Sequence, residues 1–356
     1  MRRGICSFEL GNGAGGGGGL TDSFILAEFL EATRNNIAVP ARPTRVGAFH
    51  VRPLGDGIFN LVTLLLTLVG LSVLVGLAIA LVIDSAPSLK AFGWGFVIST
   101  EWDPVNDRFG ALPFIYGTLV SSALALVIAV PLSLGVALCL SEMVPAWLSQ
   151  RLGFMVELLA AIPSVVYGLW AVFVLGPWLR DHVEPLLGAT LGFLPLFRGP
   201  RVSVSILCAG VVLAIMVVPY IAAVCTDVFR AVPQTQREAA LALGATRWEM
   251  VRIAVLPYGL SGVIGAIMLG LGRALGETIA VAMVIGNSPQ ISASLFAPSA
   301  TLASAIANEF AEATSSLYLS SLVELGLVLL VVGLALNVVA RALVLGATQR
   351  RFEGDL

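Results

Sequence analysis

Six long apolar runs dominate the pattern of hydrophobic and polar positions along this chain of 356 residues. An α-helix needs about 20 apolar residues to cross a bilayer, and every one of these runs is long enough. Backbone groups in lipid must be hydrogen-bonded within their own segment, so the pattern predicts an all-α integral membrane protein with six transmembrane helices. The predicted spans are Gly57–Ile83, Leu112–Leu140, Leu158–Leu179, Val202–Thr226, Val255–Gly286 and Ser316–Ala340.

Composition supports a membrane protein and narrows its chemistry. Hydrophobic residues make up 58% of the chain and charged residues 12%, about half of the charged fraction of a soluble domain. The four cysteines and two histidines show no spacing typical of a metal site or a disulfide framework. We therefore expect no metal and no redox centre. Prolines inside three spans, at Pro131, Pro163 and Pro219, predict helix kinks.

The distribution of basic residues predicts the orientation. With the N-terminus inside, 14 of the 20 lysines and arginines fall in cytoplasmic segments and five in outer loops. Because basic residues favour the cytoplasmic side, we expect both termini and the loop of residues 227–257 in the cytoplasm, and a location in the prokaryotic inner or plasma membrane. The predicted organisation is a tail (1–56), a first helix with its outer loop (57–111), a core of five transmembrane helices (112–345) and a C-terminal tail (346–356).

The N-terminal tail contains no run long enough for a signal peptide. Its glycine tract, Gly11–Gly19, is typical of a flexible segment. The stretch Phe24–Ala32 has two interpretations: a short amphipathic helix on the membrane or on a partner, or part of a poorly ordered tail.

The polar loop before the fifth span carries start and stop signals for two short helices. Thr235 precedes Glu238 by three residues, and Thr246 precedes Glu249 by three, so each pair predicts a capping box. Gly244 between them suits a helix end with positive φ. An ordered helical loop of this kind favours a platform for a partner protein.

The alternative is that both helices lie flat at the lipid interface, with Trp248 as an aromatic anchor. Ala239, Ala240 and Leu243 share one face of the first helix. That face is small and mostly alanine, which is weak for insertion into lipid, and this favours the partner platform.

The fifth span contains an arginine and a glutamate, Arg273 and Glu277, four residues apart. On a continuous helix they would lie one turn apart on the same face, with Arg273 near the bilayer centre. Intramembrane charges usually mark substrate or ion pathways, and the planar fork of arginine matches an oxyanion. We therefore expect an anion pathway here, although a helix-stabilising ion pair is the alternative.

Other polar residues in the spans have two interpretations each: lining a polar cavity, or hydrogen bonding between helices. They are Thr118, Ser121, Ser164, Tyr167 and Thr278. Glu324 near the outer end of the last span has two interpretations, contact with the headgroups or a role in a cavity, and Glu157 at the inner end of the third span is expected at the interface.

The polar loop resembles the cytoplasmic EAA loop of ABC importer permeases. The matching positions are Glu238, Ala239, Ala240, Gly244, Ala254, Leu256 and Pro257, with Ala254 where the family usually has isoleucine. In that family the loop forms a coupling helix that contacts a separate ATPase. The resemblance thus agrees with the absence of a phosphate-binding glycine loop from this chain.

Longer segments resemble the permeases of phosphate-specific ABC importers, and the PstC-type subunit more than its PstA-type partner. They include "GRALGETIAVAMVIGN" (residues 272–287) and residues 109–142, 157–177 and 301–313. The resemblance implies that Arg273 and Glu277 take part in phosphate passage. Thr118, Ser164 and Thr278 are further candidates for the pathway from their polar positions alone. It implies three partners: a PstA-type permease, a PstB-type ATPase dimer that uses ATP and Mg²⁺, and a PstS-type phosphate-binding protein. The chain itself is then no enzyme and binds no cofactor.

Three other functions are compatible with the sequence. Another oxyanion, such as sulfate, molybdate or phosphonate, would suit a similar permease. A standalone secondary transporter or channel would predict inverted repeats, and the sequence shows no internal repeat. A signalling scaffold that reports the transport state is a third alternative. For the leading hypothesis, the i+4 spacing suggests a switch in which Glu277 holds Arg273 whenever phosphate is absent.

Overall fold

The computed structural model describes residues 53–352, and its regular secondary structure is helical. The chain forms two units, Met1–Val69 and Gly70–Leu356. The described part of the first unit is the start of helix α2, which runs from Pro53 to Asp84. The glycine tract and the stretch Phe24–Ala32 lie outside the described residues.

Five helices of the described chain are long and apolar enough to cross a membrane, and a bent pair of helices makes a possible sixth. The prediction of an all-α protein is therefore confirmed for the described residues, and the predicted six spans are reached when the bent pair is counted as one span. The five helices, as continuous segments, are Gly57–Asp84, Leu112–Met143, Ile206–Arg230, Arg247–Gly276 and Ser316–Ala342.

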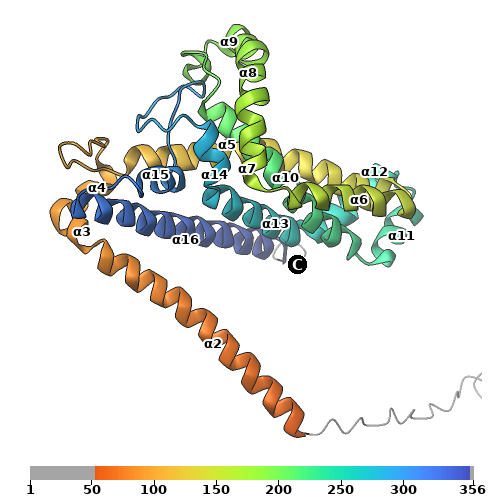
Figure 1. Cartoon of the computed structure of the whole chain (residues 1–356). Coiled ribbons are helices and arrows are strands. Elements are labelled where there is room, and N and C mark those ends of the chain that lie inside the picture. Colours follow the sequence, from red (N-terminus) through yellow and green to blue (C-terminus); the bar gives the residue numbers. More distant parts are fainter. Residues whose placement is uncertain (1–52, 353–356) are drawn as a thin grey trace, which may run out of the picture. The chain divides into compact units, whose positions relative to one another are not determined.

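The third predicted span is wrong as a single kinked helix. The chain forms α6 (Ala146–Ala161) and α7 (Ser164–Trp170), and the two parts are bent by 84°. Pro163 disfavours the helical region for the residue before it, and both Ile162 (ψ 128°) and Pro163 (ψ 138°) are extended. The chain therefore breaks at this proline, and the stretch from α7 to α9 stands away from α6 (Figure 1).

Beyond α7 the helix continues through wide π turns to the end of α9. The successive elements are η2 (Ala171–Leu175), α8 (Gly176–Trp178), η3 (Leu179–Val183) and α9 (Glu184–Leu191), and the short η4 (Pro195–Phe197) follows.

The fifth predicted span is wrong at both ends. It begins earlier, because α12 (Arg247–Met250) and the π turn η5 (Val251–Val255) join α13 (Leu256–Gly276) without a break. It also stops earlier, at Gly276, and α14 (Ile279–Val284) follows after two non-helical residues. Pro257 is tolerated in the continuous helix because it lies in the first turn of α13, after the wide turn.

The loop before α12 contains one of the two predicted capping boxes. At Thr246, the hydroxyl accepts from the Glu249 N–H and the Glu249 side chain accepts from the Thr246 N–H, so this box is confirmed. The box at Thr235 is wrong, because α11 (Gln234–Ala242) starts after Pro233 and Thr235 lies inside its first turn. Gly244 has φ +85° between the two helices, as predicted.

Helix α10 (Ile206–Arg230) forms the centre of the second unit. Within its most apolar stretch 72% of the residues are buried, against 28% for α5 (Leu112–Leu138) with its terminal π turn η1 (Cys139–Met143). Its buried side chains pack with those of α5, α13 and α14 in the largest apolar cluster. Helices α5, α10, α13 and α16 lie side by side in Figure 1. Pro131 and Pro219 remain inside α5 and α10.

A second apolar cluster joins the loop after the first span to the last helix. Trp102 packs edge-on against Phe109 and Phe114, and its indole N–H donates to Glu309, which also accepts from Tyr318. The helices of this region are α3 (Ala86–Phe92), α4 (Gly95–Ile98), α15 (Leu302–Glu309) and α16 (Ser316–Phe352). Helix α16 thus continues past Ala340 into the predicted C-terminal tail.

Candidate functional site

Close packing of α13 on α10 places Arg273 over an aromatic ring. Gly270 permits the approach, since a Cβ at that position would lie 2.7 Å from Cδ1 of Ile221. One turn further along α13, the Arg273 guanidinium carbon lies 4.7 Å from the centre of the Tyr220 ring. This cation–π contact holds the charge in place without using any of its hydrogen-bond donors.

The Arg273–Glu277 pair is loose. Nη2 of Arg273 lies 3.7 Å from Oε2 of Glu277, which is an ion pair but too long for a hydrogen bond. Among the described residues, Nε of Arg273 has no hydrogen-bond partner. The Arg273 side chain is 36% exposed, whereas that of Glu277 is 7% exposed. The guanidinium therefore keeps donors available for an anion.

The sequence predicted that Glu277 lies one turn beyond Arg273 on a continuous helix. Glu277 lies instead in a break between α13 and α14. Its backbone is extended, with ψ 121°, and its Oε1 accepts from the N–H of Ala280 at 3.4 Å. The carboxylate thus caps α14 while it faces Arg273. Non-helical backbone at membrane depth is tolerated where it is buried in protein or lines a cavity, so this break is typical of a functional position.

An open hollow of about 570 Å³ extends from Arg273. It contains two polar side chains that sequence reasoning missed, Tyr220 of α10 and Asn337 of α16. Tyr220 follows Pro219 in an otherwise apolar span, and Asn337 is the one amide of the last span, so a search for isolated polar residues would have found both. The full lining is Tyr220, Gly265, Met268, Leu269, Gly272, Arg273 and Asn337.

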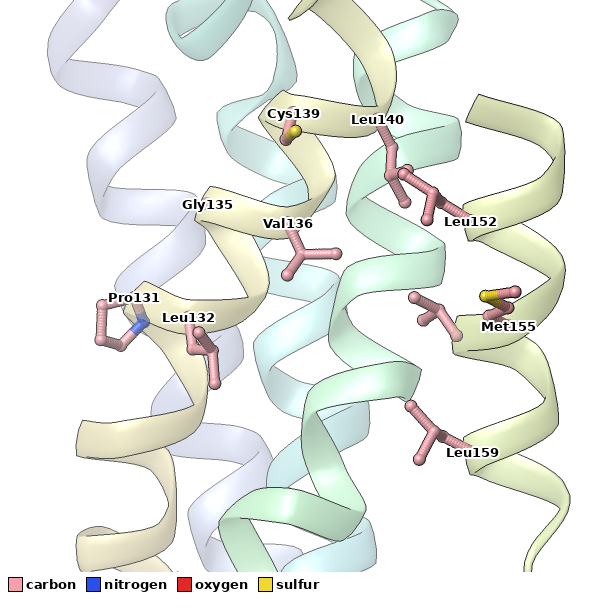
Figure 2. Close-up of a pocket in the computed structure, with 10 residues that line it drawn as sticks. Pro131, Leu132, Gly135, Val136, Cys139, Leu140, Leu152, Met155 and Leu159 are labelled. Carbon is pink, nitrogen blue, oxygen red and sulfur yellow. The ribbon is translucent and has the colours of Figure 1, made fainter. Parts of the chain in front are cut away.

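A different hollow, of about 470 Å³, lies between α5 and α6. Figure 2 shows Leu132 and Val136 of α5 and Met155 and Leu159 of α6 around it. Its lining contains no charged side chain, so it offers nothing to balance an anion.

The other predicted pathway residues do not gather at Arg273. Thr118 is buried, donates to the Phe114 carbonyl and accepts from the Leu302 N–H at 2.9 Å. Ser164 begins α7, and the Thr278 hydroxyl donates to the Gly276 carbonyl. None of the three lines the hollow. Tyr167 donates to the Leu159 carbonyl across the bend between α6 and α7, and the hydroxyl of Ser121 donates to the Thr118 carbonyl.

The predicted coupling residues divide into an exposed group and a half-buried group. Glu238, Ala239 and Gly244 are exposed, and Ala240 packs partly against the core. Leu256 and Pro257 are half-buried inside the continuous helix of α12 and α13. Three apolar side chains accompany the exposed group, with Leu241 44%, Leu243 89% and Trp248 64% exposed. Exposed apolar side chains on an ordered polar loop indicate a protein-binding surface.

Comparisons with known proteins identify relatives of this chain. Residues 129–349 match the family described as binding-protein-dependent transport system inner membrane component. The chain is 45% identical over 309 residues to the phosphate transport system permease protein PstC of Mesorhizobium japonicum, covering 85% of this chain and 94% of that protein. It is 46% identical to the Haemophilus influenzae protein of the same name, covering 81% and 93%. Phosphate transport system permease protein PstC 1 of Mycobacterium tuberculosis is 42% identical, covering 74% and 85%.

Proposed function

The chain belongs to the family of binding-protein-dependent transport system inner membrane components, and we propose that it is the permease subunit of an ATP-driven inorganic phosphate importer. The observation that carries the proposal is the Arg273 guanidinium, which is held over the Tyr220 ring, is only loosely paired with Glu277 and lines an open hollow. The chain is a transport subunit rather than an enzyme, and ATP hydrolysis belongs to a separate ATPase subunit.

Arg273 binds phosphate in transit through its free donors. Its planar fork matches two oxygens of a tetrahedral oxyanion, and hydrogen bonds between charged groups are about twice as strong as neutral ones. Glu277 competes with the anion: it neutralises Arg273 when the hollow is empty and repels an oxyanion that stays. The 3.7 Å separation supports this exchange, because no hydrogen bond must break before the anion binds.

The exposed loop is the surface that meets the ATPase. Glu238, Ala239, Ala240 and Gly244 lie on or beside it, with the apolar side chains of Leu243 and Trp248. In the proposed complex a PstA-type permease completes the pathway, a PstB-type ATPase dimer uses ATP and Mg²⁺, and a PstS-type protein delivers phosphate. Basic-residue counts favour a cytoplasmic location for this loop and for both termini.

A permease for another oxyanion would need the same arginine, so geometry alone favours phosphate no more than sulfate. The choice of phosphate over sulfate rests on the relatives named above, which are phosphate transport system permease proteins. A secondary transporter is disfavoured because it would leave the ordered, exposed loop without a role.

Reconstitution of the full complex tests the proposal. The chain is purified with its ATPase, second permease and binding protein, placed in proteoliposomes with ATP, and supplied with labelled phosphate. We expect ATP-dependent phosphate uptake that excess unlabelled phosphate abolishes and that excess sulfate, molybdate or phosphonate leaves unchanged. Uptake that sulfate suppresses as strongly as phosphate would contradict the assignment of the cargo.

A further inference from the structure

Arg237 of α11 forms four hydrogen bonds to two other parts of the transmembrane core. Its Nη2 lies 2.8 Å and its Nε 3.3 Å from the two carboxylate oxygens of Glu142, in the π turn η1 at the end of α5. Nη2 also donates to the carbonyl of Phe229 at 2.6 Å, and Nη1 donates to that of Val232. These carbonyls belong to the end of α10 and the turn after it. The side chains of Arg237 and Glu142 are 13% and 8% exposed.

Helix α11 lies against η5 and α12 but buries little apolar surface there. None of its residues is fully buried. The Ala240 side chain is partly buried against the main apolar cluster. A short surface helix with so little apolar burial swings easily when it is pushed, because few contacts resist the movement. Arg237 supplies the missing rigidity, since a bidentate contact fixes both the distance and the orientation of the helix.

A second polar link joins the same ends of the transmembrane helices to one another. Arg230 at the end of α10 donates to the Ser149 hydroxyl of α6 at 2.7 Å. That hydroxyl donates to the carbonyl of Leu140 in η1 at 2.6 Å. The ends of α5, α6 and α10 therefore form one hydrogen-bonded body, and Arg237 attaches α11 to it.

Helix α10 also carries Tyr220, the residue beneath Arg273. Tyr220 precedes Phe229 by nine residues, about 14 Å along an α-helix. The Tyr220 hydroxyl donates to the carbonyl of Ala160 at the end of α6. One rigid helix thus contacts Arg237 at its end and Arg273 at its middle.

We propose that Arg237 is a positioning residue that couples the ATPase to the substrate site. Displacement of α11 is passed through Glu142 and the Phe229 carbonyl to α5 and α10, and α10 moves the Tyr220 ring under Arg273. This inference rests on the proposed function for the identity of the ATPase partner, but the movement itself does not depend on the cargo.

The first test measures movement alone. Spin labels are placed at two exposed positions, Gln236 of α11 and Val127 of α5, in a cysteine-free background within the full complex. We expect one narrow distance distribution with and without ATP. The double variant Arg237→Met/Glu142→Gln removes both charges together, so no buried charge is left unpaired. In this variant we expect ATP to broaden and shift the distribution.

The second test measures the phosphate moved per ATP hydrolysed in proteoliposomes. The double variant should assemble and unfold close to the wild-type temperature, with this ratio reduced about ten-fold. Arg237→Lys, which keeps the charge but loses the fork, should give an intermediate ratio. Arg252→Met, an exposed arginine of the same region, is the matched control and should match the wild type.

The two measurements separate the proposals. A double variant with a wild-type distance distribution and a wild-type ratio overturns the role of Arg237. A wild-type complex that moves an anion other than phosphate overturns the cargo assignment and leaves the spin-label result intact.

Discussion

Two arginine–glutamate pairs in this chain have the same chemistry and opposite geometry. Arg237 and Glu142 are close (2.8 Å), and their side chains are 13% and 8% exposed. Arg237 satisfies its donors on Glu142 and on two carbonyls. Arg273 and Glu277 are 3.7 Å apart, Arg273 is 36% exposed, and its Nε has no partner among the described residues. In the first pair four of the five N–H donors of the arginine form hydrogen bonds, whereas the arginine of the second pair lies too far from its glutamate for a hydrogen bond.

This difference distinguishes an ion pair that fixes two helices in place from one that can bind an anion. A buried charge pair in which most of the arginine donors are used is costly to break, so it transmits force and does not exchange partners. A loose pair beside an open hollow exchanges partners at low cost, as a transport site requires. The difference is set by the backbone around each pair: η1 and the end of α10 enclose Arg237, while the break at Glu277 leaves Arg273 open.

The largest effect on stability is expected when the Arg237–Glu142 pair loses one of its residues. Arg237→Ala leaves the Glu142 carboxylate buried without a partner, which costs about 3–5 kcal/mol of stability. Thermal unfolding of the purified complex in detergent measures the loss, and Arg237→Met/Glu142→Gln should recover most of it. Equal unfolding temperatures for wild type and Arg237→Ala would show that the pair is not buried as described.

Removing the charge at the open pair should affect transport far more than assembly of the complex, because this pair is loose. We expect Arg273→Gln to assemble normally and to lower phosphate uptake by about 100-fold, within the ~2–5 kcal/mol range for truncating one member of a charge pair. Uptake in proteoliposomes measures this, with the amount of assembled complex as control. Normal uptake would refute the anion pathway.

Glu277→Gln tests the exchange between Glu277 and the anion. The amide can still accept from the Ala280 N–H, so the cap of α14 is retained while the negative charge is lost. We expect the rate of phosphate uptake to fall about five-fold, which corresponds to ~1 kcal/mol for a partly exposed ion pair. An unchanged rate and an unchanged apparent phosphate affinity would end the switch hypothesis.

The smallest effect is expected at Tyr220. Tyr220→Leu removes the ring beneath Arg273, a contact worth about 0.5–1 kcal/mol where the cation is partly exposed, so uptake should fall about two- to five-fold. Tyr220→Phe keeps the ring and loses the hydrogen bond to Ala160, which makes it the matched comparison. If Phe and Leu reduce uptake equally, the hydroxyl rather than the ring positions Arg273.

Local sequence signals located most of the fold and part of the site. Runs of apolar residues gave four of the six spans with small shifts, because burial in lipid demands length and apolarity that are visible in one dimension. The capping box at Thr246 and the positive φ of Gly244 were predictable for a similar reason, since both depend on residues a few positions apart. The Arg273–Glu277 pair was visible because charges inside a span are rare.

Long-range contacts decided the rest. The spacing of Arg273 and Glu277 did not reveal that α13 ends between them, because an apolar stretch such as Ile279–Val284 favours a continuing helix as well as a broken one. Thr118 is a cavity candidate in the sequence, but the approach of α15 uses its hydroxyl to accept from Leu302. The roles of Arg237 and Tyr220 depend on partners 95 and 60 positions away in the chain, at Glu142 and Ala160.

The sequence by itself determined the spans, the ordered loop and the presence of a charge in the membrane, since each follows from residue type and local spacing. The tertiary structure decided that Arg237 is hydrogen-bonded within the protein and that Arg273 keeps donors available. Both are arginines near a glutamate, and the packing of other helices around each guanidinium sets how many of its donors are already used.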